Sequence, residues 1–545
     1  MQNNVWIRIN QAGYTPQRKK IAVVLSDKQI SGNEWLIKKD GDTVLKGIIG
    51  GGKKGDDFWV SQKYYYYIDF SSLNEIGTYD FITDGAQAQK IIINCDPYSR
   101  FADNALTHLR AMRSGGDTLY RSPSHLKDDN AVVYEVSGNW KNGKWKKSQE
   151  SRTVDMRGGH YDAGDYIKFT LCESYLAWHL LSAYKINPSA FKKKRSSSQL
   201  PDILDEAKHC LDYLAKTFPD ENTFVIQVGD RKDHHEEPRL PQDDLLDGKR
   251  PALCAISRVH MGSAAAALAL GANIFSGINA DDAAVYKSKA IAIYARSQKK
   301  DAQVSAFERD KVNDFYYDDT DEDNMALAAV ELFNLTKEQR YLEDGKKLSP
   351  HASWSVSWDN WNAFANYRLA QAGDEKAKER LIEEALNYEH DDIWKLPNQS
   401  YGWGTLSILW IGSANAHMLA HNYNGNKNYS DVFLGVLDYT FGRNNWGISM
   451  IACEDLPFSI KNIYNSIYKI TKVFPDGAVS EGPAARKMHE QMKKYFSISS
   501  DNPFDKFNTS QGVFYDNDED FVIQESTITG QANFILMIAL ASLNY

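Results

Sequence analysis

The chain has 545 residues and a formal net charge of -9, so its composition gives no sign of a nucleic-acid partner. Hydrophobic residues make up 42% and charged residues 25%, which is typical of a soluble globular protein with a large core. No apolar run approaches the ~20 residues that a membrane-spanning helix needs. The start of the chain shows no signal peptide, so we expect a cytoplasmic protein, or a secreted or periplasmic one if a leader was removed.

Residues 1–97 have the sequence pattern of a small β-sandwich. Short runs of β-branched and aromatic residues, such as Val5–Ile9 and Tyr64–Phe70, are separated by turns rich in glycine and aspartate. Asp96 precedes Pro97, and a residue before proline is pushed away from the helical conformation. We therefore expect one domain to end at residue 97.

From residue 98 onward, apolar residues recur at spacings of three and four, which is the period of amphipathic helices. About twelve helices with long loops between them fit six helical hairpins closed into an (α/α)6 toroid. Such a fold has a cleft at the end where the loops gather. The predicted helices cover 101–113, 171–184, 201–216, 260–275, 281–296, 323–335, 359–372, 376–388, 403–421, 430–441, 484–495 and 524–543. We expect this second domain to span 98–545.

The segment Gly158–Asp165 carries two aspartates three residues apart. Only Ala163 and Gly164 separate Asp162 from Asp165, and these small residues favour a tight turn with both carboxylates in one space. Inverting glycoside hydrolysis needs a carboxylate base to activate water and a second acid across the sugar. On the local pattern alone, an Asx-turn or a calcium loop is the simpler interpretation.

A candidate for that second acid stands near the C-terminus, where Glu525 is predicted to open the last apolar helix. A glutamate in a first helical turn also complements the helix dipole, and this role alone would explain it. The dipole would lower the pKa of Glu525, whereas an acid catalyst needs a raised pKa. Ionised Asp162 and Asp165 would raise it by like-charge repulsion if the fold brings them close.

Several motifs along the chain resemble those of one family. They are Ile7 to Tyr14, Asp96 to Tyr98, Gly158 to Asp165, Pro201 to Glu206, Gln227 to Asp230 with Asp233 and His234, Arg250 with Pro251, Ser357 to Asp359, Trp403 with Gly404, Gly442 to Asn444, and Gln524 with Glu525. Their order and spacing are similar to glycoside hydrolase family 9, the inverting β-glucanase family that includes many cellulases. The similarity is to its branch with an N-terminal immunoglobulin-like domain, and it spans nearly the whole chain.

The resemblance implies an immunoglobulin-like sandwich for residues 1–97 and an (α/α)6 catalytic domain for residues 98–545. It also implies that Asp162 and Asp165 hold the attacking water and that Glu525 is the general acid. Of the two aspartates, Asp165 is favoured as the proton acceptor and Asp162 as its partner.

Further residues are expected to contact the sugar: His160, Tyr161, Asp233, His234, Trp358, Trp403 and Arg443. Two of these stand in the base motif, and the resemblance places Asp233 and His234 at the edge of the cleft. Tryptophan faces can stack on pyranose rings, although most tryptophans in a helical protein pack in the core. The alternatives are a plain surface loop for Asp233 and His234, and a helix C-terminal residue that satisfies carbonyl groups for Arg443.

Four departures from the family pattern bear on the substrate more than on the reaction. The stretch Ile451–Ile460 lacks the histidine motif that many members carry, and Asn445 stands where proline is usual. Thr529–Gln531 replaces the usual tyrosine-asparagine pair after the general acid. Arg121–Asn142 offers one histidine and no cysteine, so we do not expect the zinc that some relatives bind there.

We expect no required cofactor and no metal among the site residues. The five cysteines are sparse and lack metal-type spacing, which indicates buried reduced thiols. The acid-rich stretch Tyr316–Asn324 is compatible with a structural calcium ion. Its spacing does not match an EF-hand, however, and a solvated helix N-terminus also explains it.

The sequence therefore predicts an inverting glycoside hydrolase that cleaves β-glycosidic bonds of a β-glucan or a related polysaccharide or oligosaccharide, as an endoglucanase does. An exo-acting β-glycosidase of glucosidase or glucosaminidase type is the alternative among enzymes, favoured by the missing histidine motif and the insertion at 455–474. The alternative from another class is a non-catalytic carbohydrate-binding protein on the same fold. In each case we expect a carbohydrate ligand and a monomer.

Overall fold

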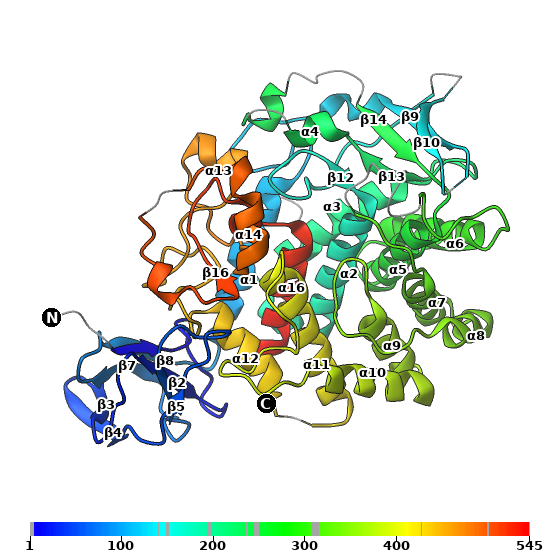
Figure 1. Ribbon diagram of the computed structural model, residues 1–545. Coiled ribbons are helices and arrows are strands. Elements are labelled where there is room, and N and C mark those ends of the chain that lie inside the picture. Colours follow the sequence, from blue (N-terminus) through cyan, green and yellow to red (C-terminus); the bar gives the residue numbers. More distant parts are fainter. Residues whose placement is uncertain are drawn as a thin grey trace.

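A small β-domain lies beside a large helical domain (Figure 1). The computed structural model describes residues 5–139, 141–148, 152–194, 199–235, 238–244, 250–307, 316–426, 428–498 and 501–543. Within these ranges, no helix combines the length and the apolar character needed to cross a membrane.

The N-terminal domain is a sandwich of two four-stranded antiparallel sheets. In spatial order these are β1 (Val5–Arg8), β2 (Ile21–Ser26), β6 (Tyr64–Asp69) and β5 (Lys53–Lys54), and β4 (Asp42–Ile48), β3 (Glu34–Lys39), β7 (Gly77–Thr83) and β8 (Gln89–Ile93). Successive side chains of a strand point to opposite faces, so Tyr79, Phe81 and Thr83 of β7 are buried while the residues between them are not. This confirms the predicted β-sandwich.

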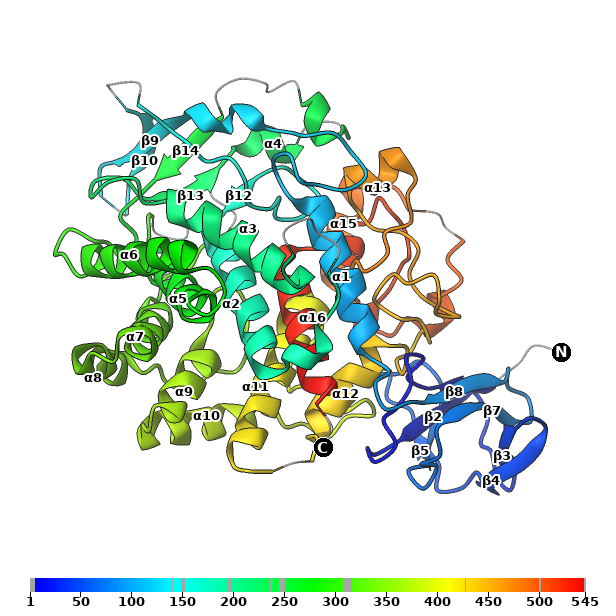
Figure 2. The same ribbon diagram turned by 180° about the vertical axis from the view of Figure 1, so that it is seen from behind.

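Twelve helices of the described chain form a closed double ring (Figures 1 and 2). The inner helices contact one another in a cycle: α2 (Thr170–Ile186), α5 (Arg258–Phe275), α7 (Glu322–Thr336), α9 (Asn362–Gln371), α11 (Ile411–Tyr423) and α16 (Ile528–Ala541). The outer helices are α1 (Ser99–Met112), α3 (Asp202–Lys216), α6 (Ala280–Ser297), α8 (Gln339–Leu348), α10 (Glu375–Asn387) and α12 (Asp431–Thr440). Every residue of α16 is buried, which explains why its apolar residues run all round the helix.

One predicted helix lies outside the ring and one helix of the ring was not predicted, although the predicted toroid is confirmed. Helix α8 was not expected, because its sequence is largely polar and buries only Tyr341, Leu342 and Gly345. The pattern at 484–495 corresponds to the short helix α14 (Arg486–Met492), which packs on the β15–β16 pair outside the ring. Helix α8 therefore completes the twelve helices of the ring between α7 and α9, and the segment 484–495 is not among them.

Short strands, short helices and loops gather at one end of the toroid (Figure 1). One sheet there has the order β10 (Lys144–Lys147), β9 (Ala131–Ser137), β14 (Pro251–Cys254), β13 (Val225–Val228) and β12 (Lys168–Phe169), with β11 (Thr153–Val154) also paired to β9. The other elements of this end are α4 (Arg231–His235), α13 (Ser466–Thr471), β15 (Ala484–Ala485), β16 (Gly512–Val513) and α15 (Phe521–Gln524). Strand β12 leads directly into the inner helix α2, so the loop end is attached to the core of the toroid.

The two domains meet at a buried ion pair. Asp438 of α12 accepts hydrogen bonds from Arg18 (2.6 Å) and from the side-chain amide of Asn10 (2.8 Å), both in the N-terminal domain. The Arg18 and Asp438 side chains are almost fully buried. Breaking such a pair would leave a charge without a partner in the interior, so the contact fixes the sandwich against the toroid.

Candidate active site

The segment Gly158–Asp165 forms a turn that is attached to two helices. Its first two glycines have φ of 89° and 74°, a conformation that residues with a Cβ rarely adopt. The N–H of Tyr161 donates to the carbonyl of Met112 at the end of α1 (2.9 Å). The carbonyl of Asp162 accepts from the N–H of Ile528 at the start of α16 (2.9 Å). The turn is therefore held between the first and the last helix of the toroid.

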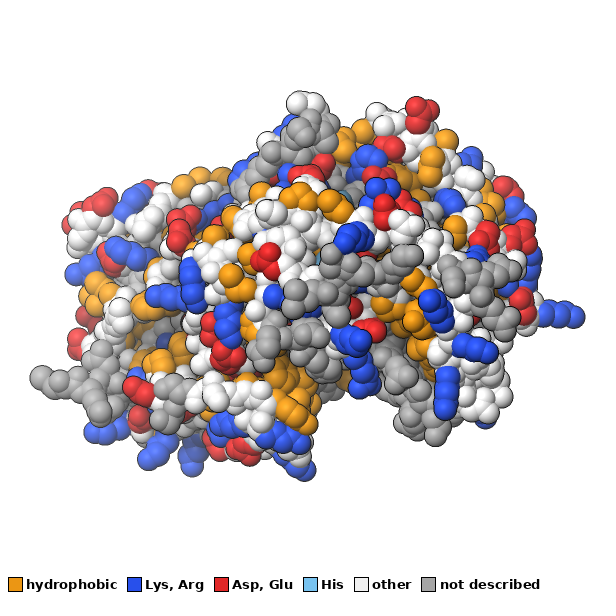
Figure 3. Space-filling view, turned by 90° about the horizontal axis from the view of Figure 1, so that it is seen from above, with side chains coloured by type: hydrophobic (Ala, Val, Ile, Leu, Met, Phe, Trp, Pro, Cys, Tyr) orange, Lys and Arg blue, Asp and Glu red, His pale blue; other side chains and the backbone are white. Residues whose placement is uncertain are grey.

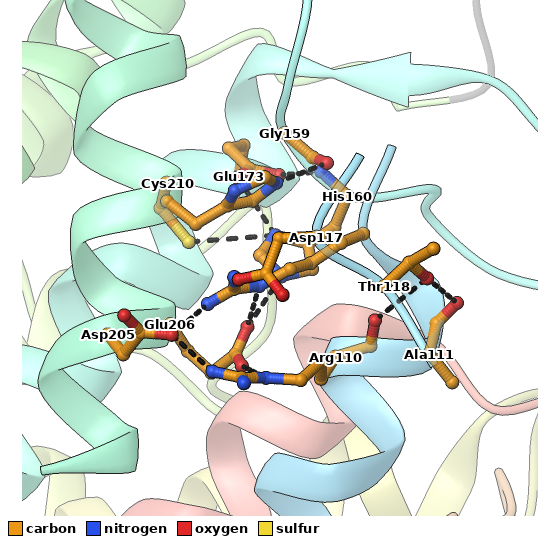
Figure 4. Close-up of polar contacts among 12 residues, drawn as sticks. Arg110, Ala111, Asp117, Thr118, Gly159, His160, Glu173, Asp205, Glu206 and Cys210 are labelled. Atoms are coloured by element: carbon orange, nitrogen blue, oxygen red, sulfur yellow. Dashed lines mark hydrogen bonds and ion pairs between the residues drawn. The ribbon is translucent and has the colours of Figure 1, made fainter. Parts of the chain in front are cut away.

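His160 lies in a buried charge network behind this turn (Figure 4). It has no exposed surface, and its two ring nitrogens lie 3.0 Å from Oε1 of Glu173 and 3.2 Å from Oε2 of Glu206. Burial lowers the pKa of His160, but these two carboxylates outweigh that effect and raise it. The structure contradicts the prediction that His160 lines the sugar site. The histidine anchors the turn instead.

Tyr161 is also buried, with its hydroxyl hydrogen-bonded to Ser124 Oγ (2.8 Å) and to the Nδ1 of His125. It has no exposed surface from which to contact a sugar, so the prediction for this residue is also contradicted. A sequence motif shows that a turn carries functional residues, but not which of its side chains point inward.

Asp162 is almost fully buried and only partly hydrogen-bonded. Its Oδ2 accepts a hydrogen bond from the hydroxyl of Tyr316, while Oδ1 has no partner among the described residues. Burial and then the neighbouring charge of Asp165 raise the pKa of Asp162 to about 8. A carboxyl with this pKa keeps its proton at neutral pH, so it can orient a water molecule but cannot take a proton from it.

Asp165 stands at the other end of the turn, where its Oδ2 lies 2.6 Å from Nδ1 of His234. Its Oδ1 accepts a hydrogen bond from the N–H of Ile167 (3.2 Å). Burial lowers the pKa of His234, but the hydrogen bond and charge of Asp165 outweigh that and raise it. The predicted cleft residue His234 therefore lies against Asp165.

Glu525 lies in an extended break between α15 and α16, with φ of -66° and ψ of 145°. The prediction that it opens the last helix is wrong, since α16 begins at Ile528. Its Oε1 accepts a hydrogen bond from the N–H of Gly164, between the two aspartates (3.1 Å). Burial and then the charge of Asp165 raise the pKa of Glu525 to about 7. The break removes the predicted conflict with the helix dipole.

Asp165 and Glu525 line one cavity of about 330 Å³ at the loop end of the toroid, together with His234, Asp233 and Tyr464. Seen from this end, acidic and basic side chains are interspersed over the surface (Figure 3). The carboxylates of Asp165 and Glu525 therefore meet at a partly enclosed space that is open to a solute.

Two residues that the sequence analysis did not assign to the site reach it. Tyr316 bonds Asp162, as described above. Glu481 is 2% exposed, its N–H donates to the carbonyl of Glu525 (2.9 Å), and its Oε2 has no partner among the described residues. Burial, and then the charges of Glu525 and Asp162, raise the pKa of Glu481. Tyr316 begins the acid-rich stretch noted in the sequence, whereas no local pattern marks Glu481.

Both predicted tryptophans lie beside residues of the site. The ring of Trp358 meets that of Tyr316 edge to face, with centroids 4.8 Å apart. The ring of Trp403 is 37% exposed and lies 5.6 Å from Phe521, in the short helix before Glu525. Their contact with a sugar stays a prediction.

Asp233 and Arg443 are both paired within the protein. Asp233 binds Arg250 (3.0 Å) and accepts from the N–H of Asp230 (2.9 Å), so it lines the cavity with its carboxylate already engaged. Arg443 is buried 3.2 Å from Asp438, in the contact between the two domains. The predicted sugar contact of Arg443 is therefore contradicted, since its charge serves the domain contact.

The comparison with protein families assigns both parts of the chain. Residues 98–538 match the model of glycosyl hydrolase family 9, and residues 2–88 match the cellulase N-terminal Ig-like domain. The chain belongs to glycosyl hydrolase family 9. The resemblance drawn from the motifs is confirmed, and the protein is a glycoside hydrolase of this inverting family.

Relatives of this family 9 hydrolase are distant in sequence. Endoglucanase D of Acetivibrio thermocellus is 23% identical over 487 residues, which cover 82% of this chain and 72% of that protein. A xyloglucan-specific endo-beta-1,4-glucanase of Bacteroides ovatus is 24% identical over 502 residues, covering 82% and 80%. The solved structure of a metagenome-derived family 9 endoglucanase matches all of both chains with a TM-score of 0.82 at 22% identity, which shows a shared fold.

Catalysis in family 9 needs no cofactor. Two described groups have metal-ligand composition, His160 with Glu173 and Cys210, and His125 with Asp233 and Asp244. The carboxylates of Asp233 and Asp244 already bind Arg250 and Arg239, and His160 binds two carboxylates. In the acid-rich stretch, Asp318 and Asp323 are buried and each has one oxygen without a partner among the described residues. Structural calcium there stays a prediction.

Proposed function

We propose that this family 9 hydrolase is an inverting, endo-acting enzyme on β-glucans, with Asp165 as base and Glu525 as general acid. The observation that supports this most is that both carboxyl groups reach one cavity while Glu525 has a pKa raised to about 7. An acid with that pKa still holds its proton near neutral pH and can give it to a leaving oxygen.

The proposed reaction uses the three acids in different protonation states. Asp165 accepts a proton from a water molecule, which attacks the anomeric carbon from the face opposite the leaving oxygen. Neutral Asp162, held by Tyr316, orients that water. Glu525 protonates the glycosidic oxygen as the bond breaks. Inversion requires the base and acid carboxyl groups to flank the sugar with room for water, a separation of about 6.5–9.5 Å.

We infer the substrate and the mode of action from the activities of the relatives. Endoglucanase D and the xyloglucan-specific enzyme are both named as endo-acting, and we propose the same for this chain. All proposed catalytic groups come from one chain, so we also propose a monomer. We place the domain boundary between residues 97 and 98, after β8 and directly before α1.

Glu525→Gln tests the proposed acid. The amide cannot supply a proton, so release of reducing sugar from a soluble β-glucan should fall by about 10²–10⁴-fold. Glu490→Gln on the exposed face of α14 is the matched control and should keep wild-type activity. An activity of Glu525→Gln within a few-fold of wild type would remove Glu525 from the mechanism.

Product analysis separates the rival functions. An endo-acting enzyme lowers the viscosity of a β-glucan early, before much reducing sugar appears, and ¹H NMR should show the α-anomer as the first product. Release of single sugar units with little loss of viscosity would favour the exo-acting alternative. Sugar binding without hydrolysis of any β-glucan by the wild type would favour the carbohydrate-binding alternative.

A further inference from the structure

A second cavity lies between the two domains, away from the catalytic cavity. It has a volume of about 690 Å³ and shares no lining residue with the cavity of Asp165 and Glu525. One wall comes from the sandwich, including Trp6 and Arg8, and the other from loops of the helical domain. Its size is in the usual range for pockets that bind small ligands.

Arg8 is a buried cation without an anionic partner. It is 7% exposed, its Nε donates to the carbonyl of Asn445 (3.0 Å), and its guanidinium lies 4.6 Å from the ring centre of Phe507. Its Nη2 has no hydrogen-bond partner, and no carboxylate pairs with it, among the residues that the structure describes. Burial lowers the pKa of Arg8 to about 9. A buried charge is costly unless it is paired, so this position lacks a counter-ion.

The helical domain is shaped to admit this strand of the sandwich. Gly447 has φ of 68°, and a Cβ built on it would lie 2.4 Å from Nη1 of Arg8. Gly442 has φ of 106°, and its Cβ would lie 2.2 Å from Nε2 of Gln11. Any larger residue at either position would displace the side chain that lines the cavity. The hydrogen bond from Nε of Arg8 to Asn445 fixes the side chain in the space that these glycines leave.

The remaining lining indicates the kind of ligand. Lys506 is exposed at the cavity, with Nζ 5.4 Å from the ring of Trp6, and no carboxylate pairs with it in the described chain. Gln62 is buried and its Oε1 lacks a partner within the described ranges. Asp27 also lines the cavity, but it is exposed to solvent. Two cations, amide groups and indole faces suit a hydroxylated ring that carries an anion.

We propose that this interdomain cavity binds a short saccharide bearing a carboxylate, such as a uronic acid, with Arg8 and Lys506 on the carboxylate and Trp6 against the sugar ring. A hydrogen bond from a guanidinium to a carboxylate is charge-assisted and is about twice as strong as one to a neutral hydroxyl, which favours an anionic sugar over a neutral one. Because both domains supply the walls, a bound ligand stabilises their contact.

The test uses cellobiouronic acid, a glucuronyl-glucose disaccharide, on the full chain carrying Glu525→Gln, so that turnover does not interfere. Binding is measured by calorimetry and by the rise in Tm, with cellobiose as the neutral match and acetate and inorganic phosphate as sugar-free anions. We expect cellobiouronic acid to bind at least tenfold more tightly than cellobiose or either simple anion.

Arg8→Gln should weaken that binding by at least tenfold, and Lys506→Gln by about threefold because its charge is more solvated. Lys506 is exposed, so its variant tests the site even if Arg8→Gln lowers the stability of the fold. Arg100→Gln, which removes an exposed cation outside the cavity, should change nothing. In the background without Glu525→Gln, Lys506→Gln should hydrolyse β-glucan at the wild-type rate, which separates this site from catalysis.

Equal binding of cellobiouronic acid and cellobiose, or binding unaffected by both Arg8→Gln and Lys506→Gln, would overturn the proposal. Acetate or phosphate binding as tightly as the disaccharide would overturn the assignment of a saccharide.

Discussion

Two groups of buried acids lie next to the Gly158–Asp165 turn and differ in how they are paired. The paired cluster behind the turn consists of Glu173, Asp205 and Glu206 with Arg110, Arg113 and His160 (Figure 4). The unpaired cluster at the cavity consists of Asp162, Glu481 and Glu525. Both groups are desolvated, so the difference between them comes from the cations.

That difference sets the protonation of each group. Burial raises the pKa of Glu206, but the charge of Arg113 and the other cations outweighs it, so the pKa falls well below its usual range. Burial, and then the charge of neighbouring carboxylates, raises the pKa of all three acids of the unpaired cluster, and no arginine or lysine of the described chain pairs with them to lower it. The paired cluster therefore holds the turn in place, and the unpaired cluster keeps protons available near neutral pH.

The largest effect on stability is expected when a member of the paired cluster is removed. Glu206→Gln leaves Arg113, which it binds at 2.7 Å, without its full charge partner in the interior. The free energy of unfolding should fall by about 3–5 kcal/mol in urea titrations. Glu221→Gln breaks an exposed pair with Lys299, which solvent screens, and should lower the free energy of unfolding far less. Equal effects of the two variants would show that the buried network does not anchor the turn.

Loss of the Tyr316 hydroxyl should weaken catalysis without unfolding the protein. Tyr316→Phe removes the hydrogen bond to Asp162, whose pKa then rises further because that bond lowers it. We expect kcat to fall about tenfold, the equivalent of roughly 1.4 kcal/mol, with little change in Tm. Tyr317→Phe is the matched control on the neighbouring residue. An unchanged kcat in Tyr316→Phe would show that the hydrogen bond between Tyr316 and Asp162 does not help to position the attacking water.

The smallest expected effect is on the pH dependence of stability. When a carboxyl group has a raised pKa in the folded state, the free energy of unfolding falls as the pH rises. The reason is that the same carboxyl in the unfolded chain releases its proton at a lower pH. Values of about 8 for Asp162 and about 7 for Glu525 place this loss between roughly pH 4.5 and pH 8. Glu481→Gln removes one contributor.

The Tm of both proteins should fall when the pH is raised from 5 to 8. The fall should be a few degrees smaller in Glu481→Gln than in the wild type. The activity of Glu481→Gln near pH 6 should stay within about twofold of the wild-type activity, because protonated Glu481 and the glutamine amide are both neutral. Glu490→Gln should follow the wild-type curve. A Tm drop in Glu481→Gln as large as that of wild type would mean that Glu481 is already ionised in the folded protein.

Much of the fold was predictable because its signals are periodic. Short runs of β-branched and aromatic residues between regularly spaced turns marked the sandwich, and the three- and four-residue spacing of apolar residues marked most of the ring. Helix α8 escaped prediction because an outer helix with a narrow buried face keeps few apolar residues. Glu525 was placed in a helix because the apolar run continues through it, whereas its extended backbone depends on the pairing of Gln524 with Tyr464 from another loop.

The candidate site was only partly predictable. Asp162, Asp165 and Glu525 stand in motifs, so residue types and order were enough to propose them. His160, Tyr161 and Arg443 were misplaced because a motif gives no direction for the side chains around it. Glu481 and Tyr316 reach the site from separate loops, and no spacing along the chain reports such a contact.

The sequence by itself determined the family, the two-domain architecture and the acids proposed for the reaction, because these depend on local periodicity and on residue types in order. Only the tertiary structure decided which acids are paired with cations and which are not. Burial and the distance to a cation set a carboxyl pKa, and both are properties of segments brought together from far apart in the chain. That pairing separates Glu206, which holds the turn, from Glu525, which retains a proton for catalysis.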